Sequence, residues 1–112
     1  MKSNKQKCLE MWQWLAVNPS KTKLNYIQYL RKLGRDEEYS SCWACEEATK
    51  KMLERGGNFS CDFCPIHWSD SMYNILCVSW PSPYALWEAG SNTERETAAL
   101  KIIQLIKETW KE

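Results

Sequence analysis

The sequence predicts a mainly α-helical fold, with about five short helices around an irregular centre pinned by zinc. Three observations lead to this expectation. Apolar residues recur at helical spacing over much of the chain. Capping residues, prolines and glycines separate these segments, and two Cys-x-x-Cys pairs lie between them. At 112 residues the chain can build one modest core, so we expect a single domain, with a short β-hairpin at the metal site as a further option.

Residues 1–34 are expected to form a helical hairpin. The first helix should run from about residue 4 to 16, and positions three and four apart give its apolar face: Cys8, Met11, Trp12 and Leu15. Cys8 lies within this stripe, far from the other cysteines in the sequence, and is interpreted as a buried core thiol.

The second helix should begin after the Asn18-Pro19-Ser20 turn, with Ser20 as its N-cap. Gly34 is expected to end it. Its apolar positions predict one broad buried face: Leu24, Tyr26, Ile27, Tyr29, Leu30 and Leu33.

A zinc-binding core is predicted over residues 42–80. Two residues separate the cysteines of each pair, and fifteen residues separate the pairs, which is the spacing of a four-thiolate site. A tight turn can aim both sulfurs of a pair at one point, and two such turns complete a tetrahedron. We therefore predict one structural zinc per chain, with these ligands: Cys42, Cys45, Cys61 and Cys64. Disulfides, a redox dithiol and buried apolar cysteines are the alternatives.

A helix is expected between the two pairs, because charged residues alternate with Ala44, Ala48, Met52 and Leu53 until Gly56-Gly57. The chain can then return and bring the second pair beside the start of the same helix. Two further residues are possible substitute ligands: Cys77 and His67.

Residues 82–112 are expected to form the C-terminal helices. Ser82 as N-cap and Pro83 at the first helical position begin a short helix that ends at Gly90. A capping box beginning at Ser91, Asn92 or Thr93 should start the last helix. Its apolar stripe is Ala99, Ile102, Ile103, Ile106 and Trp110, widened by Leu100 and Leu105.

Charge is unevenly distributed. Residues 1–35 carry eight Lys and Arg against one acid, a net charge of +7, whereas residues 36–112 carry seven basic and thirteen acidic residues, a net charge of −6. Solvated helix faces that partly attract each other on folding are one explanation, and a basic face for nucleic acid or for an acidic partner is the other. The candidate nucleic-acid contacts lie along the second helix: Lys21, Lys23, Arg31, Lys32 and Arg35.

The sequence offers little for catalysis. His67 is the single histidine, whereas an HNH-type nuclease needs a histidine base and further metal-binding histidines. Four thiolates leave no open coordination position for a hydrolytic water, and neither a βαβ pattern nor a phosphate-binding glycine loop is present. We therefore expect a non-enzymatic protein.

No signal peptide or membrane span is expected. No apolar run follows the charged N-terminal residues, and no stretch of eighteen apolar residues occurs. A cytoplasmic location follows as an expectation, and a reducing compartment favours metal thiolates over disulfides.

Several of these features together resemble a group of small accessory proteins encoded by tailed phages of Gram-positive bacteria. The resemblance is carried by the tryptophan-rich first helix ending at Asn18-Pro19, both cysteine pairs with Pro65, Cys77, and Ser82-Pro83-Tyr84 with Trp87. It implies a viral origin, the host-cell cytoplasm, and binding to a host protein, including inhibition of a host defence or regulatory system. The expected function is thus zinc-stabilised protein binding, with a nucleic-acid-binding regulator as the alternative.

Overall fold

The computed structural model describes residues 3–35, 42–56, 65–66 and 82–110. Five helices account for most of this part of the chain: α1 (Asn4–Val17), α2 (Lys23–Lys32), α3 (Trp43–Arg55), α4 (Pro83–Ala89) and α5 (Asn92–Thr109). The described residues contain no strand. The prediction of a mainly α fold is therefore confirmed, while the hairpin expected at the metal site lies outside the described residues.

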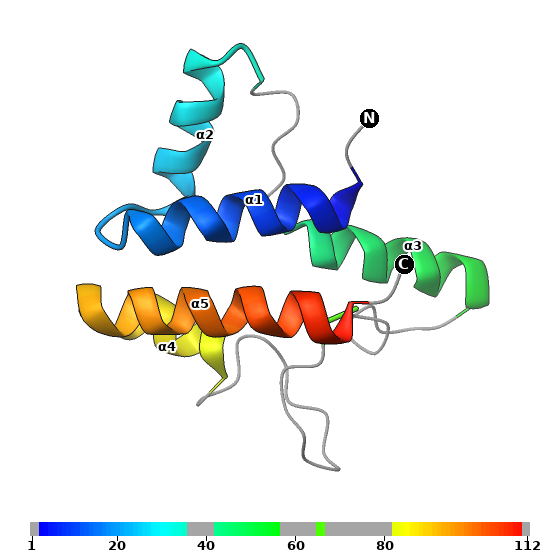
Figure 1. Ribbon diagram of the computed structural model, residues 1–112. Coiled ribbons are helices and arrows are strands. Elements are labelled where there is room, and N and C mark those ends of the chain that lie inside the picture. The colour runs from blue at the N-terminus through cyan, green and yellow to red at the C-terminus, as the bar shows by residue number, and fades with distance from the viewer. Residues whose placement is uncertain (1–2, 36–41, 57–64, 67–81, 111–112) are drawn as a thin grey trace.

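The core is built chiefly between α1 and α5, which lie side by side and run in opposite directions (Figure 1). From α1 it takes the predicted stripe, including Cys8, which is buried as expected. From α5 it takes Ile102 and Ile106, both fully buried. α4 packs along α5, and α3 packs against α1. Burying these two apolar stripes against each other is the main source of helix stability, because isolated helices of this length are marginal in water.

Helix ends follow the capping signals closely, with one exception. Ser82 caps α4, and Ser91 forms a capping box with Glu94 at the start of α5. The predicted Ser20 cap of α2 is wrong, since Thr22 accepts the Asn25 N–H at 3.3 Å and Asn25 caps the Thr22 N–H in return at 2.9 Å. The reason is a turn in which the Lys21 N–H donates to the Asn18 carbonyl, which delays the helix by two residues.

Two apolar faces are narrower than the sequence predicts. On α2 only Tyr26 and Leu30 are buried, and Leu24, Tyr29 and Leu33 are exposed. On α5 Leu105 joins the core, but Leu100 is exposed. In Figure 1 α2 diverges from α1 and stands apart from the α1–α5 layer, and its main packing contact with another described helix is the one with α1.

Candidate metal centre

The first cysteine pair lies at the N-terminal end of α3. Cys42 is the N-cap, and its Sγ accepts the backbone N–H of Cys45 at 3.2 Å. A thiol thus takes the place of the usual hydroxyl or carboxylate cap. Because one helical turn joins the two residues, both sulfurs belong to the same end of the same helix. The sequence reasoning placed the pair next to this helix but missed that Cys42 caps it.

The surroundings of Cys42 favour a thiolate. Its pKa is lowered from 9.0 to about 6. A hydrogen bond from the Cys45 side chain is the largest cause, the backbone N–H groups of Cys45 and Ala44 and the charge of Lys23 act in the same direction, and burial opposes them. Since the thiolate is the form that ligates metals, this donor suits zinc.

The core holds this end of α3 in place. Trp43 and Ala44 are buried, and Cys42 is packed against the same cluster of buried residues. Cys45 is exposed and therefore accessible from outside. At the N-terminal end of α1, the Asn4 side chain donates to the Glu47 carboxylate at 2.9 Å. This hydrogen bond links the start of α1 to the N-terminal half of α3.

The second half of the predicted site lies outside the described residues. This holds for Cys61 and Cys64 and for the substitute ligands Cys77 and His67. Within the described ranges no group of three or more His, Cys, Asp or Glu side chains could hold a metal ion. The four-thiolate site therefore stays a prediction, of which the structure describes one pair.

Two described residues follow the second cysteine pair in the sequence. Pro65 and Ile66, which directly follow Cys64, are buried, and Ile66 belongs to the same core cluster against which Cys42 packs. The chain is thus anchored in that core two residues after Cys64.

We expect zinc binding to depend on pH with a definite sign. The thiolate of Cys42 persists above its lowered pKa of about 6 and is protonated below it, and protons compete with the metal for thiolates. Zinc occupancy, measured by elemental analysis after dialysis over a pH series, should be full near neutral pH and fall below about pH 6. Release that is already extensive well above neutral pH would contradict this electrostatic description of the pair.

The five basic residues proposed for nucleic acid do not form one free row. Lys23 donates to the Tyr84 hydroxyl at 3.0 Å and lies 4.6 Å from the centre of the same ring. Arg35 pairs with Glu10 at 3.3 Å. Lys21, Arg31 and Lys32 are exposed. Contacts such as Lys23 to Tyr84, across sixty-one positions, leave no local signal in a sequence.

Lys23 belongs to an aromatic cluster that joins α1, α2 and α4. Trp12 packs edge-on against Trp87 and Tyr84, with ring centres 5.0 and 6.0 Å apart. Arg95 of α5 stacks over the Trp87 ring at 4.5 Å and donates to the Lys21 carbonyl at 2.7 Å. Two cations thus fasten the start of α2 to the core.

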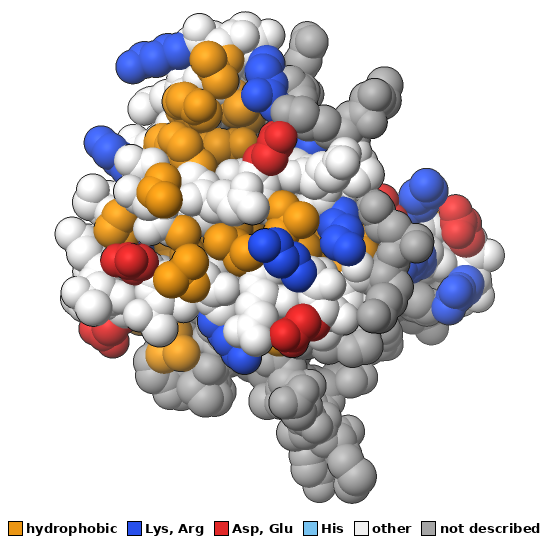
Figure 2. Space-filling model, in the orientation of Figure 1, with side chains coloured by type: hydrophobic (Ala, Val, Ile, Leu, Met, Phe, Trp, Pro, Cys, Tyr) orange, Lys and Arg blue, Asp and Glu red, His pale blue; other side chains and the backbone are white. Residues whose placement is uncertain are grey.

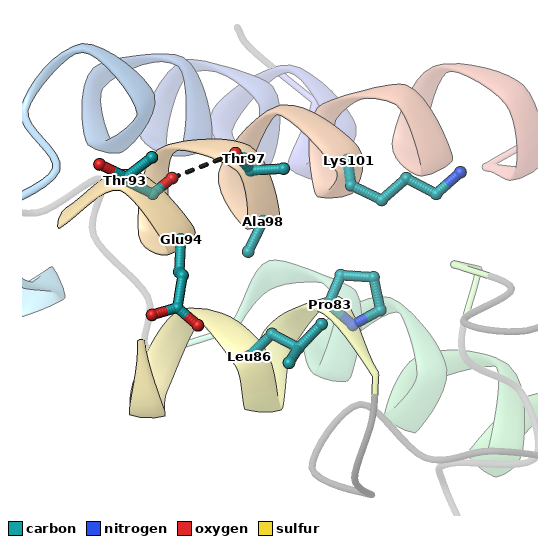
Figure 3. A pocket seen from close by; sticks show the side chains of 7 residues that line it. All are labelled: Pro83, Leu86, Thr93, Glu94, Thr97, Ala98 and Lys101. Atoms are coloured by element: carbon teal, nitrogen blue, oxygen red, sulfur yellow. Dashed lines mark hydrogen bonds between the residues drawn. The ribbon is translucent and has the colours of Figure 1, made fainter. Parts of the chain in front are cut away.

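A shallow groove of about 380 Å³ lies between α4 and α5. In Figure 3 Pro83 and Leu86 come from α4 and Ala98 from α5, and Glu94 and Lys101 lie at opposite ends. The polar groups do not converge on a point inside the groove. Its surface is mainly apolar, and its chemistry points to no particular ligand.

Comparison with known proteins gives no family for this chain. No protein-family model matches it, and neither a curated protein nor a solved structure is significantly similar. No helix among the described residues combines the length and apolar character needed to cross a membrane.

Proposed function

We propose that this chain is a non-enzymatic, zinc-stabilised helical protein whose task is to bind another protein. The observation that carries the proposal is the cysteine pair at the start of α3. Cys42 is held by the core, has a lowered thiol pKa, and accepts a hydrogen bond from the residue that would be the next ligand. With Cys61 and Cys64 as the other ligands, the zinc would be closed to water.

A closed site assigns the metal a structural role. Catalytic zinc keeps one position for water or substrate, whereas four thiolates fill the tetrahedron. The zinc would then connect the residues around Cys61 and Cys64 to α3. Such a link suits a small domain, in which the core alone supplies little net stability.

The proposed partner is a protein of a host cell. This part rests on the resemblance to accessory proteins of tailed phages, which also suggests a location in the host cytoplasm and inhibition of a defence or regulatory system. The engagement of Lys23 with Tyr84 and of Arg35 with Glu10 favours protein over nucleic acid as the partner, because both cations already have intramolecular contacts.

We expect the zinc-loaded protein to capture a specific protein from a lysate of a Gram-positive bacterium in reducing buffer, and the Cys61→Ser variant to lose it. In a gel-shift experiment at low salt it should leave DNA and RNA unshifted. A shift that disappears steeply as salt is added, together with no captured protein, would contradict the proposal and favour the nucleic-acid-binding alternative.

A further inference from the structure

The apolar stripe of α2 is only half covered. Tyr26 and Leu30 are buried, but Tyr29 and Leu33, which lie on the same side of the helix at spacings of three and four residues, are 40% and 50% exposed. An apolar stripe of this width is typical of a helix that is packed against neighbours on both sides of the stripe. In this structure α2 has its main packing contact with α1, and the outer half of the stripe faces outward.

The position of α2 makes this stripe accessible. Figure 1 shows α2 standing away from the layer formed by α1 and α5. Figure 2 shows apolar side chains gathered over this part of the molecule, with Lys and Arg side chains around their edges. The start of α2 is nevertheless fixed, because Lys23 contacts Tyr84 and the Lys21 carbonyl accepts from Arg95.

The exposed part of the stripe is also ordered in advance by aromatic contacts. Trp14 of α1 is half-buried, and its ring stacks on Tyr29 with 5.4 Å between centres and 26° between planes. Tyr26 lies 5.4 Å from Trp14 and 6.0 Å from Tyr29. Rigid Trp and Tyr side chains lose little conformational entropy on binding, and they are the residues that most often dominate interface energies.

Charge identifies the kind of partner. Of the five Lys and Arg in residues 18–35, three are exposed, namely Lys21, Arg31 and Lys32, and this range contains no acid. Glu10 of the preceding segment pairs with Arg35. Lys32 is exposed and lies three residues after Tyr29 on the helix. An acidic partner would be attracted to this face. A second copy docked face to face would bring together two copies of residues 18–35, each with five basic residues and no acid, and this repulsion opposes such a dimer.

We infer that an exposed surface on and beside α2 is a docking surface for an acidic amphipathic helix of another protein. This surface, named the α2 stripe from here on, consists of Tyr29 and Lys32 of α2 and its C-cap Leu33, together with Trp14 of α1. Apolar residues of that helix would cover Tyr29 and Leu33, and its carboxylates would lie near Lys32. The inference rests on the proposed protein-binding function and adds to it the surface used and the chemistry of the partner.

The test uses the zinc-loaded full chain and a synthetic peptide of about 18 residues, or five helical turns. The peptide carries Leu at helical spacing and Glu elsewhere, and a matched peptide has Lys in place of Glu. In two-dimensional amide NMR the Glu peptide should shift signals of the α2 stripe, and added salt should weaken the binding. The Lys peptide and a short DNA duplex should leave these signals in place.

Matched variants distinguish binding at this surface from nonspecific binding to exposed apolar side chains. Leu33→Ser should raise the Kd of the Glu peptide roughly tenfold or more, whereas Leu100→Ser should leave it unchanged. Leu33 and Leu100 are 50% and 53% exposed, so neither change should unfold the protein. Lys32→Glu should also weaken the Glu peptide, and Lys50→Glu on α3 should not.

Other results overturn the inference. They are no binding of the Glu peptide, equal binding of the Lys peptide, signal changes confined to the α4–α5 groove, or DNA bound at the α2 stripe. The first three results would overturn the docking surface but would not bear on the proposed protein-binding function, which the lysate capture experiment tests separately. Binding of DNA at the stripe would instead support the nucleic-acid alternative.

Discussion

Replacing any one of Cys42, Cys45, Cys61 or Cys64 by Ser will abolish stoichiometric zinc and sharply lower the melting temperature. A structural four-cysteine site can contribute an apparent ~10 to 16 kcal/mol of binding free energy near neutral pH. The net stability of a domain of this size is typically about 5 to 15 kcal/mol. Loss of the metal therefore removes most of the margin, and the metal-free protein should be partly or wholly unfolded.

Cys8→Ser is the control for these four variants. Cys8 is buried in the core between the helices, so its replacement should cost about 1 to 3 kcal/mol through a buried hydroxyl while zinc is retained. Full stability of Cys61→Ser, measured by thermal unfolding, would contradict the expected ligand set. Loss of zinc in Cys77→Ser, with retention in one of the four, would place Cys77 among the ligands.

Trp12→Ala should destabilise the protein strongly without removing a cysteine. Trp12 is 3% exposed and contacts Trp87, Tyr84 and the ammonium group of Lys23, which lies 5.7 Å from its ring centre. Removing a buried Trp costs about 3 to 5 kcal/mol, which corresponds to a fall in melting temperature of roughly 10 to 20 °C for a chain of this size.

The matched control is Leu100→Ala on α5, since Leu100 is exposed and surface changes usually stay within about 0.5 kcal/mol. Chemical unfolding of the two variants gives the comparison. If Trp12→Ala unfolded at the same denaturant concentration as Leu100→Ala, the aromatic cluster would not be the junction of α1, α2 and α4 that the structure indicates.

Local signals in the sequence predict the helices well. The ends of α3 and α4 follow from Gly56, which has a positive φ of 74°, and from Ser82 with Pro83. Such signals act within a few residues of the element they bound. The same reasoning failed for Ser20, because a turn closed by the Lys21 N–H and the Asn18 carbonyl moves the N-cap of α2 to Thr22.

Burial and contacts between distant residues are harder to predict from the sequence. Periodicity gives α2 a broad apolar face, but it carries no information on how many neighbours cover that face. The exposure of Tyr29 and Leu33 therefore follows from the position of α2 in space. The contact of Lys23 with Tyr84 also has no local signal in the sequence, because Tyr84 lies on a distant helix.

For the candidate metal site, too, the sequence predicts one part and the structure adds another. The spacing of the cysteines predicts a common site, and the structure adds that Cys42 caps α3 and that its thiol is biased toward the thiolate. The central prediction is that zinc joins the second pair to the first, with Cys61 and Cys64 outside the described ranges.

The most direct test is the zinc content of the protein purified in reducing buffer, measured by elemental analysis and compared with the melting temperature before and after chelation. The account predicts one zinc per chain, and its removal should cause loss of helical signal and of the cooperative unfolding transition. A protein that contains no metal and unfolds cooperatively, with its stability unaffected by the chelator, would contradict it.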